Sequence, residues 1–283
     1  MLDYYAVIGH PIKHSLSPRI HTLFAEQTQQ ALYYDKIDAP VTKFKQAIQQ
    51  FVAAGGKGLS VTVPFKQEAY ALVDRLDDSA KRCGSVNAIR VEDDGKLTGY
   101  NTDGAGLLID LKKNLNVVIK NKRVLLIGAG GAAQGVLPNL LDECPAALVV
   151  VNRTIEKASA MIARFQSSCL KACGFDELSV LPSPACGRGI EEGSFDLVIN
   201  ATSSSLSDVN LPLPNTIFSP AALSYDMFYS QQPTTFMRWS AQAGAARVID
   251  GLGMLVEQAV LAFHIWRGVY PESASVLKQL LDA

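Results

Sequence analysis

A glycine-rich loop in the middle of the chain constrains the fold more than any other feature of the sequence. The apolar run Leu125–Ile127 leads directly into Gly128-Ala129-Gly130-Gly131-Ala132-Ala133. This is the G-x-G-x-x-G/A pattern, with alanine at its third position, at the junction of a strand and a helix. Glycine allows a tight turn there and lets backbone N–H groups approach a pyrophosphate at the helix N-terminus. The loop therefore predicts a dinucleotide-binding βαβ unit, and its central position leaves the preceding part of the chain for another task.

Strand-like and helix-like segments alternate along the 283 residues, which favours a mostly parallel α/β architecture of two domains. The apolar periodicity predicts strands at 6–8, 33–37, 59–63, 123–127, 148–151, 195–200, 223–226 and 247–249, and a hairpin of 86–91 with 96–100. It predicts helices beginning at 17, and at 44–52, 104–115, 253–267 and 273–281. The stretch Ser179–Ser194, rich in proline and glycine, breaks this alternation and is expected to be a surface loop.

The composition argues against several classes of function. The formal net charge of −1 gives no indication of binding to nucleic acid or to an anionic membrane. We expect neither a secretory signal nor a membrane-spanning segment, because no apolar run has the required length. The five cysteines are scattered, which favours reduced thiols in the cytoplasm. Cys169 and Cys173 have no cysteine or histidine partners at a finger-like spacing, so no metal site is expected.

The residues that follow the second strand of the βαβ unit predict which dinucleotide binds. An NAD site usually has Asp or Glu there, whereas arginine accommodates the 2′-phosphate of NADP. Here the strand ends in Asn152-Arg153-Thr154, and Lys157 follows one turn into the next helix. A solvated Arg153 and Lys157 at an ordinary helix start, with Thr154 as the N-cap, is the alternative interpretation. Together with the glycine loop upstream, the guanidinium, hydroxyl and ammonium groups favour NADP.

Polar side chains before the glycine loop lie at the ends of predicted strands, where open α/β sheets bind ligands. Thr62, Lys66, Asn87 and Asp103 could together satisfy a small polyhydroxylated ligand. Ser15 and Ser17, at a helix N-terminus, could bind its carboxylate. The alternatives are structural, because Asp103 and Ser17 could be N-caps, Asn87 could close a turn, and Lys66 could be solvated.

These clusters, taken in order, resemble the shikimate dehydrogenase family over nearly the whole chain. The shared motifs are Ser-x-Ser-Pro, Val-Thr-x-Pro-x-Lys, Val-Asn, Asn-Thr-Asp-Gly, Gly-x-Gly-Gly-Ala, Asn-Arg-Thr, Asn-Ala-Thr, Tyr-Asp-Met-x-Tyr and Asp-Gly-x-x-Met-Leu-x-x-Gln. The resemblance implies NADPH-dependent, reversible reduction of 3-dehydroshikimate to shikimate in chorismate and aromatic amino acid biosynthesis. It implies an α/β fold with a substrate domain of residues 1–103 plus 252–283 and a Rossmann-like NADP domain of residues 104–251. The site is expected in the cleft between these domains.

The resemblance also implies roles for individual residues. Lys66 and Asp103 would be the catalytic pair, with Lys66 donating a proton to the developing alkoxide and Asp103 orienting it. Around the substrate the resemblance places Ser15, Ser17, Thr62, Lys66, Asn87, Asp103, Tyr229 and Gln258. On the cofactor it places Gly128, Ala129, Gly130, Gly131, Ala132, Asn152, Arg153, Thr154, Lys157, Met227 and Gly251, and also Asp78.

The chain departs from the family pattern at two positions. Ser60 stands where asparagine usually precedes Val-Thr, and Ser205 replaces the usual glycine after Asn-Ala-Thr. The sequence leaves open a quinate/shikimate dehydrogenase with broader substrate or cofactor use, and it does not separate a monomer from a homodimer. A non-catalytic sensor that binds NADP and a small acid is disfavoured, because Lys66 and Asp103 are both present.

Overall fold

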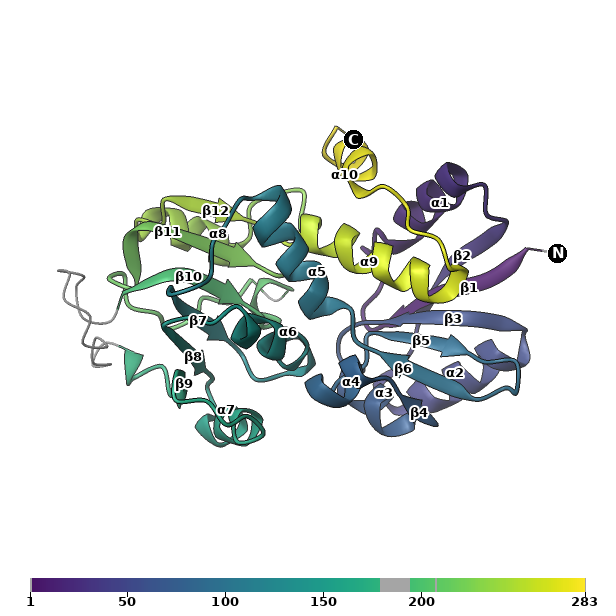
Figure 1. Ribbon diagram of the computed structural model, residues 1–283, viewed down its shortest axis with the longest axis horizontal. Coiled ribbons are helices and arrows are strands. Elements are labelled where there is room, and N and C mark those ends of the chain that lie inside the picture. The colour runs from purple at the N-terminus through teal and green to yellow at the C-terminus, as the bar shows by residue number, and fades with distance from the viewer. Residues whose placement is uncertain (1, 179–193, 207, 283) are drawn as a thin grey trace. The chain divides into compact units, whose positions relative to one another are not determined.

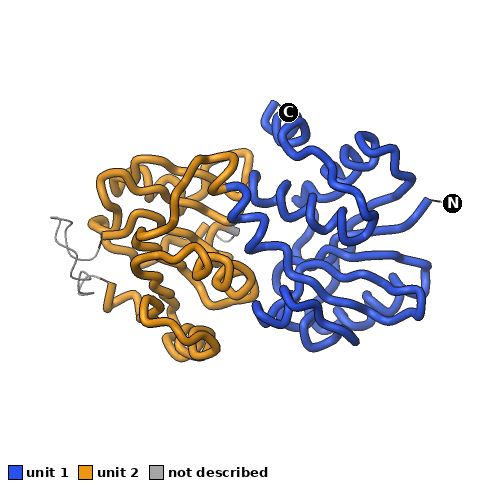
Figure 2. Tube along the Cα trace, in the orientation of Figure 1, with its two compact units in different colours: residues 1–110, 253–283 blue, residues 111–252 orange. Residues whose placement is uncertain are grey.

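The chain divides into two compact units, one formed by both ends of the sequence and the other by its middle part. The computed structural model describes residues 2–178, 194–206 and 208–282. Unit 1 comprises residues 1–110 and 253–283, and unit 2 comprises residues 111–252 (Figure 2). The sequence predicts the two boundaries between these units after residues 103 and 251, whereas the structure has them after residues 110 and 252. The loop predicted at Ser179–Ser194 lies outside the described residues, apart from Ser194.

Unit 1 is built on a mixed sheet (Figure 1). Its strand order within the described residues is β2-β1-β3-β5-β6-β4. The strands are β1 (Asp3–Gly9), β2 (Leu32–Asp38), β3 (Gly56–Val61), β4 (Arg75–Leu76), β5 (Ala88–Val91) and β6 (Leu97–Tyr100). Strands β1, β2 and β3 run parallel, whereas β5 pairs antiparallel with both β3 and β6. The predicted hairpin is therefore confirmed.

Helices cover both faces of this sheet because its strands alternate apolar side chains between two cores. The helices of unit 1 are α1 (Ser17–Thr28), α2 (Phe44–Ala53), α3 (Lys66–Leu72), α4 (Asp78–Cys83), α5 (Asp103–Ile109), α9 (Leu252–Arg267) and α10 (Ser273–Leu281). On one face, Phe44 and Ile48 of α2 pack with Leu59 and Val61 of β3. A second core joins α1, α9 and α10, which come from opposite ends of the sequence.

Unit 2 contains a parallel sheet of the Rossmann type. Its order within the described residues is β12-β11-β10-β7-β8-β9, with parallel pairing throughout. The strands are β7 (Arg123–Ile127), β8 (Ala147–Val151), β9 (Leu170–Cys173), β10 (Phe195–Asn200), β11 (Phe218–Asp226) and β12 (Arg247–Ile249). Strands β8 and β9 extend the sheet on one side of β7, whereas β10, β11 and β12 extend it on the other side. In open α/β sheets, dinucleotides bind at such a switch point, here between β7 and β10.

Within the described residues of unit 2, the α-helices between the strands are α6 (Gly131–Asp142), α7 (Ile155–Ile162) and α8 (Thr235–Gln242). Buried Leu125, Ile127 and Val198 of the sheet form one core with Phe236 of α8. Among the described helices of both units, none combines the length and the apolar composition that crossing a membrane would require.

The predicted helix 104–115 differs from the structure. The α-helix α5 ends at Ile109, and a π-helical turn, Asp110–Asn114, follows it. The short strands β4 and β9 were missed, because two to four residues carry little periodic signal. Strand β11 is longer than predicted, since it begins at Phe218 rather than at residue 223.

Candidate functional site

The carboxyl ends of the strands in unit 1 bring together a lysine and an aspartate. The Lys66 Nζ lies 2.6 Å from Asp103 Oδ2. The two side chains are only 12% and 5% exposed, respectively. Lys66 is the first residue of α3 and Asp103 the first residue of α5, so each is held at the start of a helix. A largely buried ion pair of this kind can deliver a proton to a ligand from which water is excluded.

Asn87 and Gln258 complete this cluster. Asn87 Nδ2 donates to Asp103 Oδ1 at 2.9 Å and lies 3.3 Å from Gln258 Oε1. It also lies 2.8 Å from Thr102 Oγ1, while the Thr102 N–H donates to Asn87 Oδ1 at 2.8 Å. The structure therefore joins four of the predicted substrate residues, Lys66, Asn87, Asp103 and Gln258, in one hydrogen-bonded group. Thr102 was not predicted, although it stands within the Asn-Thr-Asp-Gly motif.

A glycine on α5 allows Gln258 to reach this group from a distant part of the sequence. A Cβ atom at Gly106 would lie 2.7 Å from both the Cβ and the backbone nitrogen of Gln258. The contact is too close for any larger residue, so α5 and α9 meet backbone to backbone at this point. Gln258 Nε2 donates to the Leu255 carbonyl at 2.7 Å, which fixes the amide orientation within α9.

Two structural alternatives considered from the sequence are wrong. Asp103 is not an N-cap, because Thr102 occupies that position and the Asp103 carboxylate binds Lys66 and Asn87 instead. Ser17 is not the N-cap of α1 either. It is the first helical residue after Leu16, and its N–H donates to Ser15 Oγ at 3.3 Å. The two serine hydroxyls lie 3.2 Å apart and are buried, so they form a pair of hydroxyls at the helix N-terminus.

The remaining predicted substrate residues stand in other segments of the chain. Thr62 follows β3, and a Cβ at Gly9 would lie 2.5 Å from its methyl group. Tyr229 belongs to unit 2, in the segment after β11, where its ring stacks on Phe228. Their roles, like those of Ser15 and Ser17, stay predictions.

The glycine loop of unit 2 has the geometry that the motif predicts. Gly128 has a φ of +112°, in the region that favours glycine, and its N–H donates to the Val151 carbonyl at 2.8 Å. A Cβ there would also meet Thr202 Cγ2 at 3.1 Å. Gly130 is the N-cap of α6 and provides no side-chain cap, so the first N–H groups of the helix stay free for an anion.

Cationic side chains follow β8, next to the glycine loop in the sheet. Arg153 and Lys157 are exposed, and Thr154 is the N-cap of α7 without a side-chain hydrogen bond to the helix. Asn152 Nδ2 donates to the Thr154 carbonyl at 2.8 Å and so fixes the turn that carries Arg153. This end of unit 2 can therefore offer a guanidinium, a hydroxyl and an ammonium group to a phosphate.

Met227 and Gly251 lie together at the ends of β11 and β12. The Met227 N–H donates to the Asn200 carbonyl at 2.9 Å, and the Gly251 N–H donates to the Phe228 carbonyl at 3.1 Å. A Cβ at Gly251 would lie 2.3 Å from the Met227 carbonyl oxygen, so glycine is required there. Asp78, by contrast, is an exposed residue of unit 1 that pairs with Lys81 at 2.9 Å.

Both departures from the family pattern have hydrogen-bond partners. Tyr34 donates its hydroxyl proton to Ser60 Oγ at 2.8 Å in the interior of unit 1. Ser205 donates to Asp226 Oδ2 at 2.6 Å in unit 2. Neither the periodicity nor the motifs show which buried polar groups meet, so the contacts of Asp226 and Tyr34 could not be predicted from the sequence.

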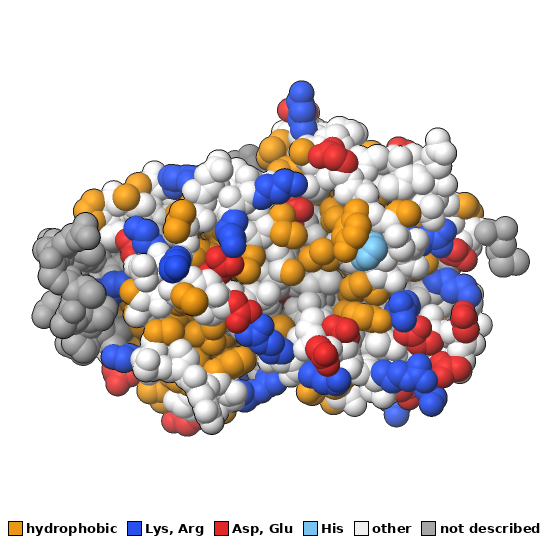
Figure 3. Space-filling model, viewed as in Figure 1, with side chains coloured by type: hydrophobic (Ala, Val, Ile, Leu, Met, Phe, Trp, Pro, Cys, Tyr) orange, Lys and Arg blue, Asp and Glu red, His pale blue; other side chains and the backbone are white. Residues whose placement is uncertain are grey.

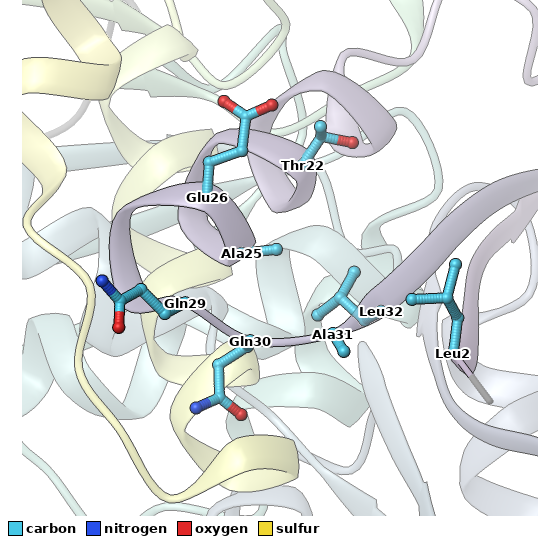
Figure 4. Close-up of a pocket in the computed structure, with 8 residues that line it drawn as sticks. All are labelled: Leu2, Thr22, Ala25, Glu26, Gln29, Gln30, Ala31 and Leu32. Atoms are coloured by element: carbon cyan, nitrogen blue, oxygen red, sulfur yellow. The ribbon is translucent and has the colours of Figure 1, made fainter.

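A pocket of about 440 Å³ lies at the C-terminal end of α1. Figure 4 shows the described residues that line this pocket, which are Leu2, Thr22, Ala25, Glu26, Gln29, Gln30, Ala31 and Leu32. Among these residues, Glu26 has the titratable side chain. Basic and acidic side chains are intermixed on the face in Figure 3. In the part of the chain that the structure describes, no cluster of three His, Cys, Asp or Glu side chains could hold a metal ion.

Three segments of the chain match known families. Residues 7–89 match the shikimate dehydrogenase substrate binding domain, and residues 251–281 match the shikimate 5′-dehydrogenase C-terminal domain. Residues 110–209 match shikimate / quinate 5-dehydrogenase.

Full-length relatives agree with these matches. The chain is 50% identical to shikimate dehydrogenase (NADP(+)) of Alkalilimnicola ehrlichii, over 99% of both chains. It is 48% identical to the protein of that name in Methylobacillus flagellatus, over 100% of both chains.

Solved structures give the same result. The Ael1 enzyme from Pseudomonas putida is 42% identical, with a TM-score of 0.85 over 98% of both chains. The shikimate 5-dehydrogenase of Thermus thermophilus, crystallised with NADP(H) and shikimate, is 29% identical, with a TM-score of 0.82 over 100% of this chain and 99% of that one.

Proposed function

The chain belongs to the shikimate dehydrogenase family, and from that premise we propose which of its side chains perform the reaction. The protein is an NADP-dependent oxidoreductase that interconverts 3-dehydroshikimate and shikimate in aromatic biosynthesis. Reduction requires a hydride at the carbonyl carbon and a proton at the carbonyl oxygen. NADPH, when bound, supplies the hydride.

We propose that Lys66 supplies the proton. The observation that carries this proposal is the ion pair of Lys66 with Asp103, at 2.6 Å and almost buried. An ammonium held in a site that excludes water stabilises a developing alkoxide and donates a proton to it. In the oxidative direction the neutral amine accepts the proton from the hydroxyl.

Asp103 orients Lys66 and accepts a hydrogen bond from a neighbouring substrate hydroxyl. The amide of Asn87 holds its other carboxylate oxygen at 2.9 Å, so the carboxylate has a fixed plane. Fixed polar groups cost no reorganisation during reaction, which is how they lower the barrier. The remaining proposed substrate residues, which would bind its hydroxyls and carboxylate, are Ser15, Ser17, Thr62, Asn87, Tyr229 and Gln258.

The residues of unit 2 fit NADP. The free N–H groups at the start of α6 suit the pyrophosphate, and a side chain at Gly128 would be strained there. Arg153, Thr154 and Lys157 would hold the 2′-phosphate, with Asn152 fixing their turn. Met227 and Gly251 would lie at the nicotinamide end. Asp78, which lies in unit 1 with Lys81 as its partner, is also proposed to contact the cofactor.

Replacing the proposed proton donor tests this assignment. Lys66→Ala should lower kcat for 3-dehydroshikimate reduction by about 10²–10⁴-fold, the usual worth of general acid–base catalysis, with a smaller change in KM. The consumption of NADPH, followed by its absorbance, measures both constants. Lys57→Ala, which removes an exposed lysine on β3, serves as the control and should keep normal kcat. Near-normal kcat in Lys66→Ala would remove Lys66 from the mechanism.

We also propose that the enzyme works in the cytoplasm as a monomer or a homodimer. A biosynthetic reaction that consumes NADPH supports this location. In the described part of the chain, Cys83, Cys144, Cys169 and Cys173 form no disulfide, as expected under reducing conditions. Sedimentation at enzyme concentrations used for assay would decide between the two states.

A further inference from the structure

Asp226 is a carboxylate buried at the end of β11, and neutral groups surround it. Its side chain is fully shielded from solvent. Asn200 Nδ2 and the Phe228 N–H donate to Oδ1 at 3.1 and 3.2 Å. The hydroxyls of Ser205 and Thr234 each donate to Oδ2 at 2.6 Å. Burial raises the pKa of Asp226, while these four hydrogen bonds oppose that increase.

These hydrogen bonds join two stretches of unit 2 that are separated in the sequence, residues 200–205 and 226–234. Asn200 ends β10, and Ser205 lies in the 3₁₀ turn that follows it. Phe228 lies just beyond β11, and Thr234 is the N-cap of α8. The carboxylate therefore fixes the turns after β10 and β11 relative to each other. Removal of the carboxylate would leave several buried donors without an acceptor, so both turns would have to move.

The strand order shows which part of the cofactor these turns face. The glycine loop follows β7, and the proposed 2′-phosphate residues follow β8 on one side of it. Strands β10 and β11 lie on the other side of β7. Because a dinucleotide extends across the carboxyl ends of the strands from the switch point, its nicotinamide half lies over β10 and β11.

We propose that Asp226 is a positioning residue for the nicotinamide half of NADP. The carboxylate acts through the backbone of Met227 and through the Asn200–Ser205 turn, and does not itself touch the cofactor. The Met227 N–H is bonded to the Asn200 carbonyl at 2.9 Å, which links the two turns a second time. This inference rests on the proposed cofactor site and adds a residue that holds its shape.

Ser205 distinguishes the hydrogen-bonded group around Asp226 in this chain from the family pattern. The family resemblance predicts glycine at this position, which could not contact Asp226 through a side chain. Here the Ser205 hydroxyl provides one of the two short hydrogen bonds to Oδ2. The serine thus adds a hydrogen bond to the positioning group rather than disturbing the turn.

Binding of a cofactor fragment distinguishes positioning from a general structural role. The dissociation constants of NADP and of 2′-phosphoadenosine 5′-diphosphoribose, which is NADP without nicotinamide, can be measured by calorimetry. Asp226→Ala should weaken NADP roughly tenfold and Ser205→Ala roughly threefold, less than the loss of a direct hydrogen bond to a charged group, because both side chains act through the backbone. Both variants should bind the fragment within about twofold of the wild-type constant, because its contacts lie at β7 and β8.

Ser240→Ala is the matched control. Ser224 of β11 donates to Ser240 of α8 at 2.7 Å, so this substitution disrupts another buried hydroxyl pair between the same two elements. It should lower the melting temperature without changing either dissociation constant. Equal weakening of NADP and fragment in Ser205→Ala, or weakening of neither, overturns the inference, even if Asp226→Ala fails to fold. A wild-type protein that binds neither molecule would instead refute the cofactor site itself.

Discussion

At the scale of single residues, the site of unit 1 depends on one ion pair whose partners are almost fully desolvated. Burying two charges costs several kcal/mol per ion, so such a pair adds little net stability. Asp103 recovers part of that cost through Asn87, which donates to its second oxygen. Because an apolar pair would be at least as stable, the arrangement is better explained by the proton transfer that we propose for Lys66.

Arg153 is the residue on which the choice of cofactor should depend. Arg153→Ala should weaken NADPH by about 10- to 150-fold, the equivalent of a charge-assisted hydrogen bond of roughly 1.5–3 kcal/mol, and leave NADH nearly unchanged. Fluorescence titration with each cofactor measures the difference. Arg164→Ala, an exposed arginine beyond the other end of α7, is the control. Equal losses for NADPH and NADH would show that Arg153 does not contact the 2′-phosphate.

At the scale of elements, helix α9 packs closely against α5 and β3 because each of these two elements has a glycine at the contact. Gly106 of α5 leaves room for the backbone of Gln258. Gly58 of β3 leaves room for the ring of Trp266, because a Cβ at Gly58 would lie 2.5 Å from Trp266 Nε1. Trp266 also donates to the Ile89 carbonyl at 3.0 Å. The contact at Gly106 brings the helix near enough for Gln258 to meet Asn87, whereas the contact at Gly58 fixes its other end.

Filling the space at Gly106 should therefore affect both stability and substrate binding. Gly106→Ala should destabilise the protein by about 1–3 kcal/mol through overpacking and raise the KM for shikimate, because Gln258 is displaced. Urea unfolding and steady-state kinetics measure the two effects. Gly58→Ala is the matched control, since it disturbs the far end of α9 at Trp266. It should lower stability but leave the KM for shikimate unchanged, and an equal rise in both variants would contradict the role given to Gln258.

At the scale of the whole molecule, both units bury polar groups as well as apolar side chains. One buried polar residue of unit 1 is His21 of α1. Its ring is completely buried, stacks on Tyr34 with centroids 4.2 Å apart, and its two nitrogens have no hydrogen-bond partner among the described residues. Burial lowers the pKa of His21 from 6.5 to about 3.

This histidine makes the stability of the protein depend on pH. Below pH 6.5 the unfolded chain protonates His21 while the folded chain does not, so stability falls as the pH decreases from 6.5 towards 3. Between pH 6.5 and 5 the loss from this group should be about 2 kcal/mol. His21→Phe should remove that part of the decline in urea unfolding. Phe24→Leu, in the same core, should lower stability equally at both pH values, and an unchanged slope in His21→Phe would contradict this account.

The sequence alone determined the sheet-and-helix alternation, the hairpin and the glycine loop, and its motifs indicated Lys66, Asn87 and Asp103 as candidate site residues. These features are local, because periodicity, turn residues and short motifs act within a few positions of each other. Only the tertiary structure decided that Gln258 joins Asn87, that Asp103 is a ligand of Lys66 rather than a helix cap, and that Ser205 satisfies buried Asp226. Such contacts join residues that are distant in the chain. Which buried polar groups meet depends on how closely the backbones approach, and no local pattern records that distance.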